Sequence, residues 1–265
     1  MSGPALVLVA HGTRSAKGVE MIAELAEAVA RELGVPVPAR GRTSEGSQTG
    51  AGAVFGAAPA SLRSAPLVRT AFVDVLGPAP AEVLGDLGSV PAVVVPAFLA
   101  SGYHVYQDVP REVAASAHPA VAVTPAMGPD PMLAMVMRVR LRAAGWRPGD
   151  AVVFAAAGSS DARARHDVRC AAAMLAEQIG APVQVAYIAT GAPRVPEVVA
   201  SVRKSGARRV FLASYLLAHG LFHQRLHEAG ADGVADPIGT HPAVVRLLAD
   251  RYRTAAGALA TVRVA

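Results

Sequence analysis

Three ionisable side chains in the first half of the sequence lie at or just beyond the ends of apolar runs that have the length of buried strands. They are His11, Asp74 and His104. Two imidazoles and a carboxylate suit a divalent first-row metal such as Fe²⁺, Co²⁺ or Ni²⁺, and imidazoles also move protons near neutral pH. The structural alternative is that His11 is a turn histidine bonded to the backbone and that His104 is a partly exposed side chain.

The sequence contains an internal repeat of about half its length, and this repeat favours the functional interpretation of the three residues. Residues 6–14 open the first half with an apolar run and a Gly-containing turn, and residues 152–160 repeat that pattern in the second half. In the repeat register the three ionisable residues fall opposite Ala157, Ala189 and Phe222. A structural role would tend to be filled in both copies, so the asymmetry indicates one active site on a symmetric frame.

Strand and helix patterns alternate along both halves. Apolar, β-rich runs predict strands at 5–10, 68–73, 92–99, 121–124, 151–156, 184–188, 209–216 and, more weakly, 233–236. Helical spacing predicts helices at 17–33, 80–87, 161–179 and 195–204, with further helices after Pro131 and Pro242. The alternation indicates an α/β fold of two similar doubly wound parallel-sheet lobes that face a central cleft. Ligands of such sheets bind outside the carboxyl ends of the strands, where the three ionisable residues lie.

We expect two domains that follow the repeat. Residues 1–146 form an N-terminal lobe that carries the metal site, and residues 147–265 form a C-terminal lobe that lacks the ligands. The halves differ most at about 38–67, a stretch rich in Gly, Ser, Ala and Pro with no counterpart in the second copy. We interpret it as a flexible surface insertion, disordered rather than a lid.

Composition and charge restrict the class of protein and of partner. Of 265 residues, 52% are hydrophobic and 17% charged, which excludes a disordered chain. No apolar stretch has the length of a membrane span and the start resembles no signal peptide, so we expect a soluble, cytoplasmic protein without membrane contact. The single Cys170 cannot form an internal disulfide. The net charge of +5 favours an anionic small molecule, and the aromatic content of 5% makes nucleic acid the weaker choice.

Three motifs in chain order resemble the class II tetrapyrrole chelatases, the sirohydrochlorin chelatase (cobaltochelatase or ferrochelatase) family. They are Val-Ala-His11-Gly-Thr-Arg14 after a strand, Ala71-Phe72-Val73-Asp74 followed by prolines, and Pro96-Ala-Phe-Leu-Ala-Ser-Gly102-Tyr103-His104-Val105. The resemblance covers nearly the whole chain apart from the insertion. It implies insertion of Co²⁺ or Fe²⁺, with Ni²⁺ as a further candidate, into sirohydrochlorin on the way to sirohaem or cobalamin.

The resemblance also implies roles for residues. His11 and His104 would be the catalytic residues, binding the incoming metal and helping to take protons from the pyrrole nitrogens. The family usually has Glu at the position of Asp74, whose side chain is shorter. Asp74 would therefore be a direct ligand, act through water, or hydrogen-bond to the residues that bind the metal. We expect no permanently bound cofactor, a tetrapyrrole and a metal ion as the partners, and a monomer or weak dimer.

Other residues are weaker candidates for substrate or metal binding. Arg14 would meet a substrate carboxylate bidentately or cap a helix, and Ser159 would cradle a carboxylate or serve as an N-cap. Thr13, Gly102 and Tyr103 complete the predicted substrate set. If residues 218–228 are helical, His219, His223 and His227 share one face, and His219 and His223 form an additional metal-site candidate.

Two other functions compete with the chelatase interpretation. One is a metal- or tetrapyrrole-binding protein without turnover. The other is a chelatase that acts on another tetrapyrrole, such as a protoporphyrin-type ferrochelatase; the basic charge and the low aromatic content favour the more carboxylated substrate.

Overall fold

The computed structural model describes residues 3–13, 15–35, 65–74 and 76–262. Arg14 and nearly all of the predicted insertion at about 38–67 lie outside the described residues. None of the described helices is long and apolar enough to cross a membrane.

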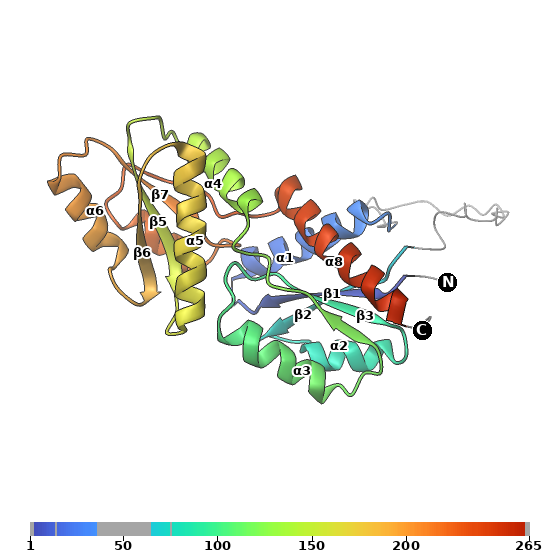
Figure 1. The fold of residues 1–265 in the computed structure, drawn as a ribbon. Coiled ribbons are helices and arrows are strands. Elements are labelled where there is room, and N and C mark those ends of the chain that lie inside the picture. The colour runs from blue at the N-terminus through green and yellow to red at the C-terminus, as the bar shows by residue number, and fades with distance from the viewer. Residues whose placement is uncertain (1–2, 14, 36–64, 75, 263–265) are drawn as a thin grey trace, which may run out of the picture.

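Two parallel four-stranded sheets form the frame of the molecule (Figure 1). The first sheet has the order β2-β1-β3-β4 and the second the matching order β6-β5-β7-β8, so each sheet starts at a central strand and winds outward in both directions. The strands are β1 Ala5–His11, β2 Val68–Val73, β3 Ala92–Pro96, β4 Val121–Val123, β5 Ala151–Gly158, β6 Val183–Thr190, β7 Val210–Tyr215 and β8 Gly233–Val234. The predicted α/β fold of two duplicated sheets is confirmed.

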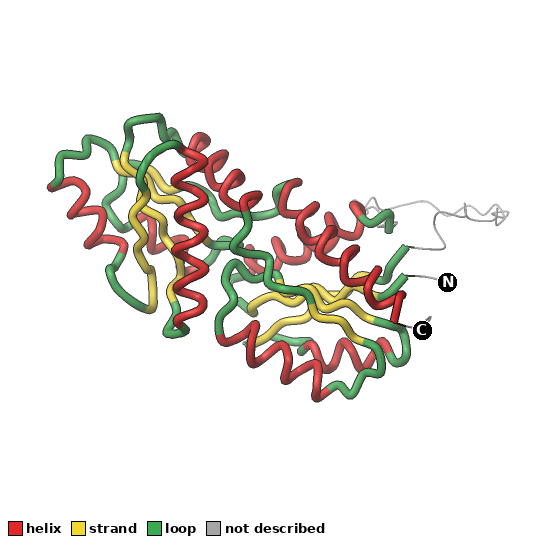
Figure 2. The backbone as a smooth tube through the Cα atoms, in the orientation of Figure 1, coloured by secondary structure: helices red, strands yellow, loops and turns green. Residues whose placement is uncertain are grey.

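Helices cover both faces of each sheet, as Figure 2 shows for the whole backbone. They are α1 Ala16–Glu32, α2 Pro80–Leu87, α3 Val109–Ala115, α4 Pro131–Ala143, α5 Ala162–Ile179, α6 Val195–Lys204, α7 Leu221–His227 and α8 Pro242–Val262, with a π-helix, η2, at His104–Asp108. Local signals set several of the starts, because the side chains of Ser15, Asp130 and Asp161 accept backbone N–H groups in the first turns of α1, α4 and α5.

The central strands are apolar along their whole length because both of their faces are covered. In β1, Leu6 and Leu8 pack into the cluster that includes Leu25 of α1, whereas Val7 and Val9 pack on the opposite face with Leu84 of α2. The alternation follows the two-residue period of a strand. His11 is the first exposed residue of β1 and marks the point where the strand leaves the core.

The helices that end the two halves are exchanged between the sheets. The helix α4, from the first half, packs against α5 and β7 of the second sheet, and α8, from the second half, packs against α1, β3 and β4 of the first (Figure 1). One apolar cluster therefore runs from Leu6 through Trp146 and Phe154 to Leu248. The domain division at residues 146 and 147 stays a prediction, to which the structure adds this shared core.

The shared core makes a stability prediction. Leu248 of α8 is completely buried, and Leu248→Ala should lower the free energy of unfolding by about 2–5 kcal/mol because it leaves a cavity. Denaturation followed by the fluorescence of the buried Trp146 and by far-UV circular dichroism should give coincident transitions.

The matched control is Val139→Ala on α4, where the side chain is 42% exposed and the expected change is within about 0.5 kcal/mol. Two well-separated transitions in the unmodified protein would show that the sheets unfold independently and that the core is not shared.

Candidate metal and substrate site

His11 is held at the end of β1 with one ring nitrogen occupied. Its Nδ1 lies 2.7 Å from the carbonyl oxygen of Gly12, so Nδ1–H donates and Nε2 keeps the lone pair of the neutral ring. Gly12 is required for this turn, because even a methyl group there would overlap the backbone of Asp74 and Leu76. The imidazole is about half exposed, and its Nε2 is chemically free to bind a metal or a proton.

His104 is held by a buried carboxylate. It is the first residue of η2, and its Nδ1 lies 2.7 Å from Oδ2 of Asp108. The other carboxylate oxygen of Asp108 pairs with Nη2 of Arg111 at 2.9 Å. Asp108 is 8% exposed. A carboxylate on Nδ1 fixes the tautomer and orientation of the ring and makes Nε2 a stronger ligand and base. Sequence reasoning missed Asp108, although a carboxylate four residues after a candidate ligand His is a usable signal.

The two imidazoles lie side by side. The ring centroids of His11 and His104 are 4.9 Å apart, and the ring planes are at 78° to one another. With metal–nitrogen distances of about 2.1 Å, two rings that share one ion have centroids on the order of 5 Å apart. The structure thus brings together the two histidines that the sequence singled out, at a spacing that suits one ion.

Asp74 lies beside this pair without completing a three-ligand set. Its backbone has a φ of +63°, a left-handed conformation that Asp adopts more readily than most residues. Its Oδ2 is 3.6 Å from Nε2 of His11. Within the described part of the chain, no group of three or more His, Cys, Asp or Glu side chains could hold a metal ion. Direct ligation by Asp74 therefore stays a prediction; the geometry places its carboxylate where it pairs with His11 once that ring is protonated.

An open pocket of about 450 Å³ in the first lobe reaches the imidazole of His104. Its lining includes Asp74, His104, Asp108, Arg111 and Glu112. Three carboxylates against one guanidinium favour a cation there, although the whole chain carries a net charge of +5.

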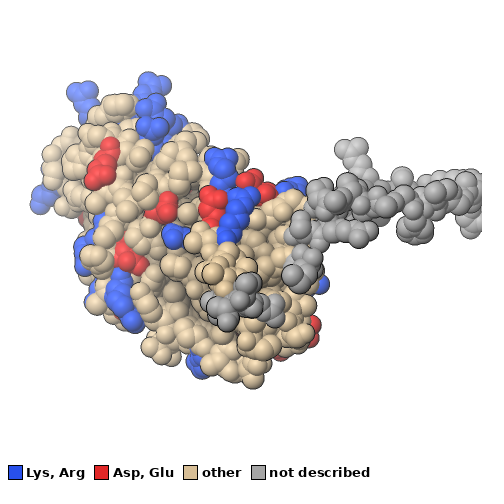
Figure 3. Space-filling view, turned by 45° about the vertical axis from the view of Figure 1, so that its right-hand side comes forward, with Lys and Arg blue, Asp and Glu red and all other residues tan. Residues whose placement is uncertain are grey.

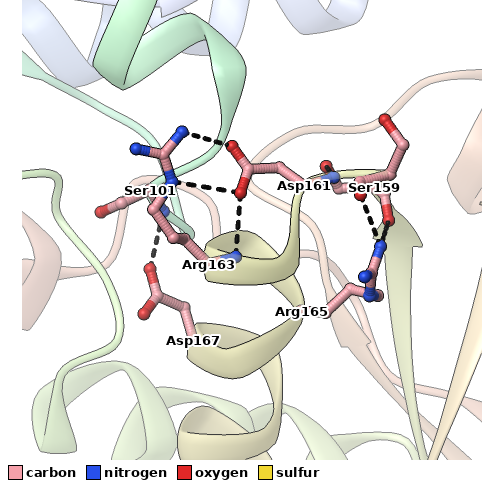
Figure 4. A network of polar contacts seen from close by, with 7 residues as sticks. Ser101, Ser159, Asp161, Arg163, Arg165 and Asp167 are labelled. Atoms are coloured by element: carbon pink, nitrogen blue, oxygen red, sulfur yellow. Dashed lines mark hydrogen bonds and ion pairs between the residues drawn. The ribbon is translucent and has the colours of Figure 1, made fainter.

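The loop between β3 and η2 is docked on the second lobe (Figure 4). The amide of Ser101 donates to Oδ2 of Asp167 on α5 at 2.8 Å, and the hydroxyl of Tyr215 on β7 donates to the carbonyl of Leu99 at 2.6 Å. Burial raises the pKa of Tyr215, which keeps the hydroxyl a neutral donor. Gly102 fits closely against α5, where an added side chain would press on Ala164. These contacts hold the loop that presents His104.

Large apolar side chains are exposed after two repeat-related glycines. Tyr103 and Tyr106 follow Gly102 and are 59% and 46% exposed, and Leu221 and Phe222 follow Gly220 and are 58% and 37% exposed. Exposed apolar groups of this size commonly mark a ligand surface. The sequence analysis named Tyr103 but missed the other three, which the repeat register of the two glycines could have indicated.

Polar groups near the start of α5 are already engaged in the fold. Oγ of Ser159 accepts the amide of Asp161 at 3.0 Å, and Asp161, not Ser159, is the N-cap of α5. The guanidinium of Arg163 pairs with Asp161, which lowers the pKa of that carboxyl (Figure 4). The same guanidinium lies 4.0 Å from the ring centroid of Tyr106. Arg165 donates to the carbonyls of Ser159 and Ser160. Substrate binding by Ser159 stays a prediction.

In the first lobe, Oγ1 of Thr13 accepts a hydrogen bond from the amide of Ser15 at 3.2 Å, so the Thr13 side chain stabilises the turn that leads into α1. Substrate contacts by Thr13, Gly102 and Tyr103 also stay predictions. Figure 3 shows Lys and Arg side chains in several separate groups on one face of the molecule.

The histidine trio of the second lobe departs from its expected setting. The helix α7 begins at Leu221, so His223 and His227 are helical, whereas His219 precedes the helix and its Gly220 N-cap. A helix over residues 218–228, which was the condition for one shared face, is present only from Leu221 to His227, because Gly220 precedes the helix as its N-cap.

Comparison with known proteins identifies the architecture. The CbiX family model matches the chain twice, over residues 39–144 and 151–255. The second match begins with β5, and the first begins beyond His11. Two matches to one model confirm the internal duplication. No curated protein matches the sequence.

Solved chelatase structures share the fold over almost their full length. SirB from Bacillus subtilis with Fe³⁺ aligns with a TM-score of 0.73 at 22% identity, over 95% of each chain. SirB from Bacillus subtilis subspecies spizizenii in complex with cobalt gives 0.67 at 22%, over 96% of this chain and 95% of that one. CbiX, described as the terminal enzyme of sirohaem biosynthesis in denitrifying bacteria, gives 0.64 at 20%, over 95% and 99%.

The carboxylate behind His104 makes the binding prediction. Asp108→Asn should weaken Co²⁺ binding by about 10–100-fold, because the neutral amide no longer raises the basicity of the ring or fixes its tautomer. Isothermal titration with Co²⁺ measures the effect. The control is Asp86→Asn, an exposed carboxylate on α2, which should leave the affinity unchanged. Equal affinities for both variants would remove Asp108 from the account.

Proposed function

The chain belongs to the CbiX family, and on that premise we propose that it is a sirohydrochlorin chelatase, which inserts Co²⁺ or Fe²⁺ into sirohydrochlorin. The family match and the shared fold of the SirB and CbiX structures confirm the resemblance that the three sequence motifs indicated. The observation that carries the proposal is the pair of imidazoles, His11 and His104, 4.9 Å apart and present in one repeat only.

The two imidazoles suit a metal that has to leave again. Each ring has Nδ1 bound to an oxygen acceptor of the protein, so each offers Nε2 alone. A site with so few protein ligands keeps coordination positions open for the pyrrole nitrogens of the substrate. As the metal–nitrogen bonds to the macrocycle form, those to the histidines break and the ion passes to the tetrapyrrole.

Insertion of a divalent ion releases two pyrrole N–H protons, and bases must accept them. A histidine that has given up the metal regains the lone pair on Nε2 and can take a proton near neutral pH. The carboxylate of Asp74, 3.6 Å from Nε2 of His11, stabilises the imidazolium that results. We therefore assign His11 and His104 as ligands and bases in turn, with Asp74 as the charge partner of His11 and Asp108 as that of His104.

The surroundings suit a flat, carboxylated ring. The exposed Tyr103 and Tyr106 of the first lobe and Leu221 and Phe222 of the second offer apolar surface to the macrocycle. Arg163 already stacks on Tyr106, and Arg165 lies on the same turn of α5. A guanidinium has five N–H donors, and those not used in the contacts with Asp161, Ser159 and Ser160 bind the peripheral carboxylates of the substrate.

Metal and setting follow from the same site. Imidazole accepts Fe²⁺, Co²⁺ and Ni²⁺, so we propose that metal supply decides whether the product serves sirohaem or cobalamin. We further propose that the protein is cytoplasmic and has no permanent cofactor. We propose a monomer because the two fused lobes already supply both sides of the site.

Absorbance of the metallated product tests the proposal. With sirohydrochlorin and Co²⁺, His11→Ala and His104→Ala should each lower kcat/KM by at least about 100-fold, which is the smallest loss expected when an acid–base group is removed. His166→Ala is the matched control, since that imidazole is exposed on α5 and its Nε2 lies 3.5 Å from Sγ of Cys170. Stoichiometric metal binding without metallation in the unmodified protein would instead support a carrier, and unchanged rates in both variants would remove the site assignment.

A further inference from the structure

Three imidazoles outside the candidate site form a row in the second lobe. The ring centroids of His219 and His223 are 4.9 Å apart, and those of His223 and His227 are 5.0 Å apart. Both spacings equal, within 0.1 Å, the 4.9 Å between His11 and His104. Neither the family match nor the chelatase chemistry assigns these rings a task.

The middle ring of the row is preset as a ligand. His223 is 6% exposed, and its Nε2 lies 3.2 Å from the carbonyl oxygen of Ala235. Because Nε2–H donates to that carbonyl, Nδ1 keeps the lone pair of the neutral ring. A backbone carbonyl on one ring nitrogen is the usual partner of a metal-binding histidine. Burial also lowers the pKa of His223, which keeps the ring neutral.

The outer rings are accessible. His219 and His227 are both exposed, so an ion can reach the row from solvent. His219 also lies at the junction of the lobes, because its carbonyl and the side chain of Thr13 both crowd Gly18 at the start of α1. The row thus begins beside the turn that follows His11.

We propose that this row is a second transition-metal site, which holds one ion between Nδ1 of His223 and a ring nitrogen of His219 or His227. The row takes a single ion because His223 has only one free nitrogen. Two imidazoles with water in the remaining positions favour Ni²⁺, Co²⁺ or Zn²⁺ over Mg²⁺ or Ca²⁺. The site is an exchangeable one, since no described group of three His, Cys, Asp or Glu side chains closes around an ion.

The proposal stands independently of the chelatase assignment, and its test removes the first site. In a His11→Ala/His104→Ala variant, titration with Ni²⁺ by equilibrium dialysis should leave one bound ion per chain. Adding His219→Ala and His227→Ala, both exposed, should weaken that ion at least about tenfold, since even an outer partner of a ligand is worth that much. Mg²⁺ at the same concentration should not compete.

The control adds His166→Ala to the same background, because His166 and Cys170 are also paired on an exposed helix face, with Nε2 3.5 Å from Sγ. The remaining ion should be unaffected. Absence of a bound ion in the His11→Ala/His104→Ala variant would overturn the proposal. An ion insensitive to the loss of His219 and His227, or lost with His166, would overturn it as well.

Discussion

The proposed chemistry of this protein depends on two imidazoles that each have one ring nitrogen hydrogen-bonded to an acceptor of the protein. The carbonyl of Gly12 and the carboxylate of Asp108, each 2.7 Å from an Nδ1, decide which tautomer the neutral rings adopt. A neutral imidazole without such a hydrogen bond would exchange between its two tautomers, and its ring would rotate. Fixed in this way, two rings 4.9 Å apart each keep Nε2 for an ion, and we propose that they share one. Both acceptors belong to the backbone or to a buried side chain, so the arrangement exists before the substrate arrives.

The parallel sheet supplies this arrangement from two strands. β1 and β3 pair in register, so their carboxyl ends meet at one edge, where His11 ends β1 and the loop after β3 leads to His104. That loop would be loose on a single lobe. Its amide and carbonyl contacts with Asp167 and Tyr215 dock it on the second lobe. The second copy of the repeat is thus the support on which the loop that leads to His104 is held.

Much of the fold followed from the sequence because its signals are local. Buried parallel strands appear as continuous apolar runs, and the repeat register related the two copies, so the frame and the meeting of His11 with His104 could be predicted. The exchange of α4 and α8 could not, since the sequence pattern of a helix shows its apolar face but not which of two sheets it covers. The π-helix at His104–Asp108 and the helix α3 behind it gave no recognisable period. The start of α7 after Gly220 could have been predicted from the glycine, but the regular spacing of the three histidines suggested a longer helix.

Anomalous diffraction from a crystal soaked in Co²⁺ is the most direct measurement of the central claim. The account predicts a peak at His11 and His104 with cobalt about 2.1 Å from Nε2 of both rings and Nδ1 of each still on its oxygen acceptor. Cobalt bound through Nδ1, or bound to one of these rings without the other, would contradict it.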